Sequence, residues 1–145
     1  MLRAVTPGLI DARKGAIEAF NNKGTDYRRH VLTSQRELWS HLLRELAPDD
    51  DVSAWIDGLN HSIKTDTYYH DKKLTRKARL DFIYRRYKDS SLSSFIDKDI
   101  SAILEMIRTF NHLHELNQNI EDWELKVLLS RSDSSLRYIL NIGVD

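Results

Sequence analysis

The chain has 145 residues, of which 41% are hydrophobic and 30% are charged, and this fits one domain with one core. The 22 basic and 22 acidic residues leave no net charge, which excludes a global attraction to nucleic acid or membranes, so any such affinity must be local. Cysteine is absent, which excludes disulfides, thiol catalysis and zinc sites built on thiolates.

Apolar residues recur at helical spacing nearly throughout, and the alternation typical of strands is missing. The sequence therefore predicts an all-α fold, a single-domain bundle of about six helices over residues 1–145, either alone or as a module of a larger protein. A first helix is expected to begin after Thr6 and to end near Gly24. A second should run from about Tyr27 to Leu46, where Ala47-Pro48 ends it.

The residues at the ends of the later helices predict where those helices begin and end. The acidic run 49–51 predicts that Asp50 or Asp51 begins a short helix reaching Gly58. Residues 59 to about 74 have little periodicity and are expected to form the longest loop. A helix capped by Thr75 should continue to about Lys88. A fifth should begin near residues 92–94, and the last should run from about residue 119 to 140.

The fifth of these helices has an apolar stripe of isoleucines that becomes polar at its end. On a helical wheel, Asn111 and His114 continue the stripe, while Arg108 and His112 lie on its flank. One interpretation is functional: Arg108 contacts a phosphate, His114 acts as acid or base, and Asn111 orients one of them during metal-free RNA cleavage.

The other interpretation is structural. Asn111 and His114 would be hydrogen-bonded groups of the interior or of a dimer interface, with Arg108 on a solvated flank. In an unbroken helix Arg108 and His114 diverge by about 120°, so a joint site requires a break near Phe110 or a second copy in a homodimer.

A basic stretch after residue 71 is the best local candidate for phosphate contacts. The residues assigned to nucleic-acid binding are Lys72, Lys73, Arg76, Lys77 and Arg79. Four aromatic residues near this stretch, Tyr68, Tyr69, Phe82 and Tyr84, are suited to stack on the bases of a single strand. The alternative is an ordinary solvated face.

Other chemistries lack support in the sequence. Neighbours two apart on a helix point in different directions, so His112 and His114 do not predict a metal site, and no metal or cofactor is expected. The glycines do not form a phosphate-binding loop. Three tryptophans are expected to be core or interface anchors: Trp39, Trp55 and Trp123. No segment has the roughly 20 apolar residues of a membrane span, and no signal peptide is evident, so a soluble, cytoplasmic protein without membrane contacts is expected.

The chain has two resemblances to known families. The spacing from Arg108 to His114 is similar to the Arg-x4-6-His motif of the HEPN superfamily of helical ribonucleases, and Arg36 and His41 form a second match. The stretch 27–49, followed by Val52 and Trp55 and then by Thr75-Arg-Lys-Ala-Arg-Leu80, resembles bacterial domains called predicted pPIWI-associating nucleases. With the segment 110–114, this similarity spans about residues 16 to 140.

The resemblances imply a helical module of a prokaryotic conflict system, often the carboxy-terminal part of a larger protein. The resulting hypothesis is a HEPN-like, self-associating domain of antiviral defence that cleaves RNA without a metal. One alternative is a non-catalytic interaction or dimerisation module. Another is a nucleic-acid binder without cleavage, which would show salt-dependent affinity and no product.

Overall fold

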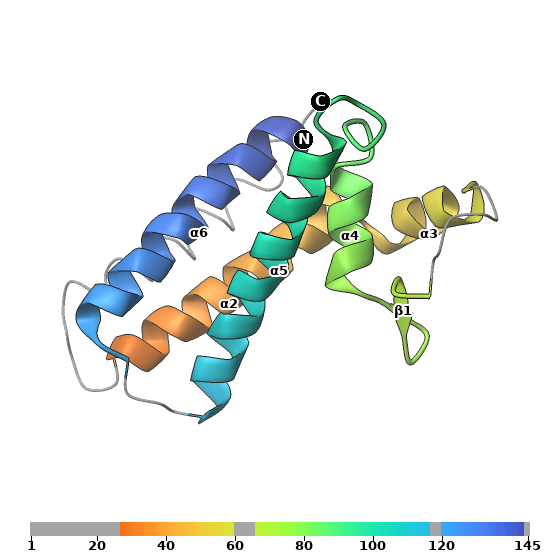
Figure 1. Ribbon diagram of the computed structural model, residues 1–145. Coiled ribbons are helices and arrows are strands. Elements are labelled where there is room, and N and C mark those ends of the chain that lie inside the picture. The colour runs from red at the N-terminus through yellow and green to blue at the C-terminus, as the bar shows by residue number, and fades with distance from the viewer. Residues whose placement is uncertain (1–26, 60–65, 117–119, 144–145) are drawn as a thin grey trace.

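The computed structural model describes residues 27–59, 66–116 and 120–143, which contain five helices and a two-stranded sheet (Figure 1). The helices are α2 (Tyr27–Leu46), α3 (Asp49–Asp57), α4 (Arg76–Ile83), α5 (Ser93–Leu116) and α6 (Asp122–Gly143). Strands β1 (Tyr69–His70) and β2 (Lys73–Leu74) pair antiparallel. The prediction of an all-α fold is confirmed, with five helices in the described ranges instead of about six. The helix expected between Thr6 and Gly24 lies outside the described residues.

Most helix boundaries agree with the sequence patterns. Helix α2 occupies its predicted range, and α5 begins within the predicted window. Helix α3 begins at Asp49, slightly before the expected start, and places all three acidic residues in its first turn, where the partial positive charge of the helix end stabilises them. The side chain of Thr75 accepts a hydrogen bond from the Ala78 amide at 3.2 Å, so it caps α4 as predicted.

Helix α4 is shorter than predicted, because it ends at Ile83 instead of continuing to Lys88. Tyr84 is fully buried, and its hydroxyl donates to Asp99 of α5 at 2.7 Å. This contact accompanies a change to tighter turns, in which the Tyr87 amide donates to the Tyr84 carbonyl, three residues back, at 2.9 Å. The early end of α4 is thus associated with a tertiary contact that helical periodicity cannot report.

Part of the predicted loop is a β-hairpin, so the expectation of an irregular segment was wrong for residues 69–74. Asp71 and Lys72 form its two-residue turn with φ of 50° and 67°, the left-handed conformation of a type I′ turn. Neither position is a glycine, which removes the usual sequence signal for such a turn. The Thr75 hydroxyl donates to the Thr67 carbonyl at 2.7 Å and joins the hairpin to the start of α4.

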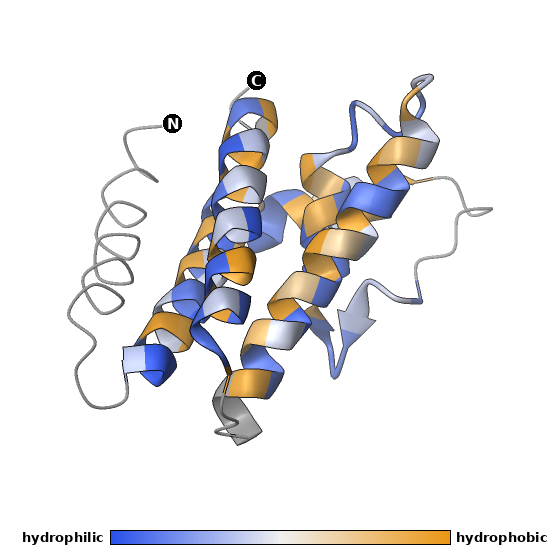
Figure 2. Cartoon of the chain, turned by 60° about the vertical axis from the view of Figure 1, so that its left-hand side comes forward, coloured by the Kyte–Doolittle hydropathy of each residue, from blue (hydrophilic) through white to orange (hydrophobic). Residues whose placement is uncertain are grey.

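Helices α2 and α5 pack at the centre of the molecule, α4 and α6 contact both of them, and α3 packs on α4 (Figure 1). The described helices carry both polar and apolar residues (Figure 2), as expected for amphipathic helices with one face turned to the core. The predicted isoleucine stripe of α5 is buried. Trp39 is also buried; its indole Nε1 donates to Ser132 Oγ at 2.9 Å, and Ser132 donates to Gln35 at 2.6 Å, which ties α2 to α6.

The three tryptophans differ in how deeply they are buried. Trp39 is a core anchor, as predicted. Trp55 is partly buried, and its ring centroid lies 5.8 Å from that of Tyr68. Trp123 is 67% exposed, so the prediction that it anchors the core is wrong, and a role at an interface stays a prediction.

None of the helices in the described ranges combines the length and the apolar content that crossing a bilayer requires.

Candidate functional site

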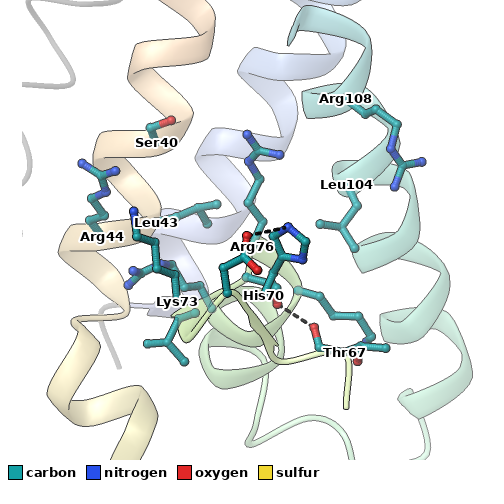
Figure 3. Close-up of a pocket in the computed structure, with 14 residues that line it drawn as sticks. Ser40, Leu43, Arg44, Thr67, His70, Lys73, Arg76, Leu104 and Arg108 are labelled. Carbon is teal, nitrogen blue, oxygen red and sulfur yellow. Dashed lines mark hydrogen bonds and ion pairs between the residues drawn. The ribbon is translucent and has the colours of Figure 1, made fainter. Parts of the chain in front are cut away.

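A groove of about 750 Å³ lies between α2, α5, the start of α4 and the hairpin (Figure 3). Figure 3 shows Arg44 on α2 and Arg108 on α5 on opposite sides of this space, with Arg76 of α4 between them. A smaller hollow of about 460 Å³ adjoins the groove, because Ser40, Arg44 and Arg76 line both. The groove and the hollow together are called the arginine groove below, after Arg36, Arg44, Arg76 and Arg108.

Helical spacing explains how each element presents its side chains to this site. On α2, Arg36, Ser40 and Arg44 are four residues apart and therefore share one face. On α5, Arg108 and Asn111 are three residues apart and also share one face. Arg76 is the first residue of α4. The four guanidinium groups thus come from three helices that are distant in sequence.

Arg76 is repelled electrostatically by Arg108 and Arg36. The pKa of Arg76 is lowered first by desolvation among its neighbours and then by the positive charges of Arg108 and Arg36. An arginine keeps its proton at neutral pH despite such a decrease, so the site is strongly positive in a chain of zero net charge. Within the described residues, no carboxylate forms an ion pair with Arg36, Arg44 or Arg76. This arrangement fits an anionic ligand.

Arg108 does have a carboxylate partner, Glu105, whose Oε2 lies 2.6 Å from its Nη1. Both side chains are largely exposed, at 71% and 66%, so the pair contributes little to stability. A bidentate phosphate is a stronger partner for a guanidinium than one exposed carboxylate. Arg108 can therefore exchange Glu105 for a ligand at little cost.

The residues predicted to contact phosphate are only partly brought together. Lys73, Arg76, Lys77 and Arg79 line the groove, whereas Lys72 is exposed on the hairpin turn and does not. Lys77 Nζ lies 3.0 Å from the buried Asp81 carboxylate. Arg79 binds Asp49 and donates to the Ala47 carbonyl. Lys77 and Arg79 therefore hold the fold together, which leaves Lys73 and Arg76 as the available cations of this set.

The proposed catalytic set is also divided. Arg108 lines the groove and Asn111 the adjoining hollow, but the side chain of His114 lies outside the part of the chain that the structure describes. Helix α5 continues unbroken from Ser93 to Leu116, so the break considered near Phe110 is absent. His112 is exposed and lines neither cavity.

Three of the four aromatic residues expected to stack on bases are instead part of the core. Tyr68, Phe82 and Tyr84 are buried. The Tyr68 hydroxyl donates to Asp81 at 2.7 Å. Burial, followed by hydrogen bonds to Asp81 and Asp99 respectively, raises the pKa of Tyr68 and of Tyr84. The stacking prediction was wrong for these three residues; Tyr69 is exposed.

Sequence reasoning missed the contribution of α2. Arg36, Ser40 and Arg44 were not among the predicted site residues, although their four-residue spacing is a visible signal for one polar face. His41 also lines the hollow, and its Nε2 lies 3.9 Å from Glu45 on the next turn. The match of Arg36 and His41 to an arginine–histidine spacing also pointed to this helix.

Asn111 is positioned unfavourably for stability. Its Oδ1 is buried and has no hydrogen-bond partner among the described residues. A buried polar atom without a partner destabilises the folded state by about 1–3 kcal/mol. We therefore expect Asn111→Leu to raise the free energy of unfolding by about 1 kcal/mol, measured by urea denaturation. His112→Leu, on the exposed face, should change it by less than about 0.5 kcal/mol. A clear loss of stability in Asn111→Leu would show that the amide has a structural role.

The described residues contain no group of three or more histidine, aspartate or glutamate side chains able to hold a metal ion.

Comparison with protein families finds a match to the model described as predicted pPIWI-associating nuclease, which covers residues 2–139. No curated protein and no solved structure matches the chain.

Proposed function

The chain belongs to the family of predicted pPIWI-associating nucleases, and we propose that it cleaves RNA in the arginine groove without a metal ion, as part of a prokaryotic defence system. The family description also supports a pPIWI protein as its partner. The observation that carries the proposal is the convergence of four guanidinium groups from three helices, three of them without a carboxylate partner in the described ranges. The same proposal includes that the domain is HEPN-like.

The chemistry of RNA suits such a site. Each internucleotide phosphate carries a negative charge, and the charge on its oxygens increases in the transition state of cleavage. A guanidinium donates two parallel hydrogen bonds to a phosphate and keeps its charge at all physiological pH values. Arg76 lies between Arg44 and Arg108 (Figure 3), and this position supports a role for Arg76 and Arg108 in binding the scissile phosphate.

RNA supplies its own nucleophile, which is why no metal is required. The ribose 2′-oxygen attacks phosphorus while a base takes its proton, and the bond to the 5′-oxygen breaks as an acid protonates that oxygen. The products are a 2′,3′-cyclic phosphate and a free 5′-hydroxyl. Two histidines are candidates for the proton transfers: His114, assigned from the sequence, and His41, which lines the hollow beside Arg36 and Arg76.

A homodimer belongs to the proposal as well. Because Arg108 and His114 diverge around the unbroken α5, a second copy of the chain is one way to complete a site from both residues. In that arrangement His114 of one copy serves the arginine groove of the other.

The test is incubation of the purified chain with mixed RNA in the presence of EDTA. Arg108→Ala is expected to lower the cleavage rate by about 100-fold, because it removes one charged donor to the transition state. Arg137→Ala is the matched control: Arg137 is 68% exposed and pairs with a carboxylate one turn away, as Arg108 does, but lies on α6. Its rate should stay within about twofold of the wild type.

The comparison of His41→Ala with His114→Ala assigns the acid or base. Cleavage that survives Arg108→Ala and both histidine variants would refute this active site. Cleavage that depends on added Mg²⁺ would refute metal-free chemistry.

A nucleic-acid binder without cleavage is the second candidate, because cations without carboxylate partners are sufficient for binding. It would give salt-dependent RNA affinity and no product. If RNA is neither bound nor cut while a dimer persists in light scattering, the chain is an interaction module.

A further inference from the structure

The groove has apolar as well as basic side chains on each of its sides. In each case a leucine lies beside an arginine, either close in sequence or one helical turn away, and all six side chains line the same cavity of about 750 Å³. The pairs are Leu43 with Arg44 on α2, Leu74 of β2 with Arg76 of α4, and Leu104 with Arg108 on α5.

The leucines differ in how much surface they offer to a ligand. Leu43 is buried in the core. Leu74 and Leu104 pack against the core but keep part of their surface exposed. Covering this apolar surface stabilises a complex by about 25 cal/mol for each Å² removed from water. The ligand that fits the groove therefore combines negative charges with apolar surface close to them.

We propose that the arginine groove binds single-stranded rather than duplex nucleic acid, with phosphates on the arginines and base faces on Leu74 and Leu104. This inference rests on the proposed function to the extent that nucleic acid is the ligand. A single strand exposes the faces of its bases beside its phosphates, whereas a duplex stacks those faces inside and would leave both leucines uncovered. Every base has such a face, so this contact tolerates different sequences.

The size of the cavity supports the same assignment. A volume of about 750 Å³ falls within the roughly 300–1,000 Å³ of sites that enclose a small ligand. A space of this size accommodates a few groups of one strand. The core aromatics cannot provide this contact, because Tyr68, Phe82 and Tyr84 are buried. The leucines provide the apolar contact in their place.

The experiment measures binding by fluorescence anisotropy, with the full chain and a labelled RNA of about 12 nucleotides whose 2′-O-methyl groups prevent cleavage. Three probes are compared: the single strand, the same strand annealed to its complement, and a strand of equal length with abasic sites at its centre. The single strand is expected to bind at least about tenfold more tightly than either of the other two, because the duplex hides its base faces and the abasic strand lacks them at its centre, so neither covers the leucines.

The variant Leu104→Gln distinguishes the contribution of base contacts to the binding affinity from the contribution of charges. It should weaken binding of the single strand about tenfold, leave the abasic strand within about twofold, and leave the salt dependence unchanged, since no charge is removed. Leu128→Gln is the matched control, because Leu128 is also a partly buried leucine on the core but lies on α6 outside the groove. Leu74→Gln replaces Leu104→Gln if circular dichroism shows that the latter is unfolded.

Equal affinity for duplex and single strand would overturn the inference while leaving RNA binding intact. Equal weakening of the intact and abasic strands by Leu104→Gln would also overturn it. Absence of binding to all three probes would overturn the proposed function, and this inference with it.

Discussion

Replacement of Asp81 by asparagine is expected to lower the free energy of unfolding by about 3 kcal/mol. Asp81 is 1% exposed, and its Oδ2 accepts a hydrogen bond from the Tyr68 hydroxyl at 2.7 Å. The same oxygen lies 3.0 Å from Lys77 Nζ and 2.9 Å from Lys88 Nζ. Loss of the negative charge would leave both ammonium groups without their carboxylate partner.

The two lysines are partly exposed, so they can turn toward water, which places the expected loss at the lower end of the range for a broken buried ion pair. Urea denaturation followed by circular dichroism measures the change. Asp89→Asn is the matched control: Asp89 is exposed, and its exchange should alter stability by less than about 0.5 kcal/mol. A loss below about 1 kcal/mol in Asp81→Asn would show that the lysines do not depend on this carboxylate.

The Asp81 cluster also supports the candidate site. Tyr68 lies just before the hairpin, and its backbone carbonyl accepts a hydrogen bond from the Thr75 amide at 3.0 Å. Through these contacts Asp81 fixes the hairpin and the start of α4, where Arg76 begins the helix. We therefore attribute a structural role to Lys77, which binds Asp81, and not the phosphate contact that its place in a basic run had suggested.

The fold was largely predictable because its determinants are local. The apolar stripes of α2 and α5, the stop at Pro48 and the cap at Thr75 are all encoded within a few residues of the elements that they define. Two departures from the predicted elements had non-local or unusual causes. Helix α4 ends where Tyr84 reaches Asp99 on α5, and the second position of the hairpin turn is Lys72, where glycine is the usual residue.

The candidate site was less predictable, because it depends on which helix faces pack together. Periodicity shows that Arg36 and Arg44 share a face, and that Arg108 and Asn111 share another. It does not show that these two faces meet beside Arg76. Nor does a count of charges distinguish Arg76, which has no carboxylate partner in the described ranges, from Arg79, which Asp49 holds.

Removal of the four positive charges of the arginine groove is expected to have the largest effect on ligand binding. The variant carries Arg36→Gln, Arg44→Gln, Arg76→Gln and Arg108→Gln. Its affinity for single-stranded RNA should fall by at least about 100-fold at about 0.1 M salt, because guanidinium–phosphate contacts supply most of the binding free energy. Its stability should not fall, because the variant relieves the desolvation of Arg76 and its repulsion by Arg108 and Arg36, which together lower the pKa of Arg76.

The matched control removes four positive charges from outside the groove. These residues are exposed and line neither cavity, and their changes are Arg86→Gln, Lys98→Gln, Lys126→Gln and Arg137→Gln. Because the net charge of both variants is the same, any difference between them reports the position of the charges and not their number.

The most direct test of the arginine groove is the slope of log affinity against log salt concentration for a 2′-O-methylated single strand. Each phosphate contact contributes about −0.7 to this slope, so four contacts predict a wild-type slope of about −3 or steeper. We expect the groove variant to lose most of that slope and the control variant to keep it. Equal slopes for the two variants would contradict the assignment of the arginine groove as the site that binds RNA.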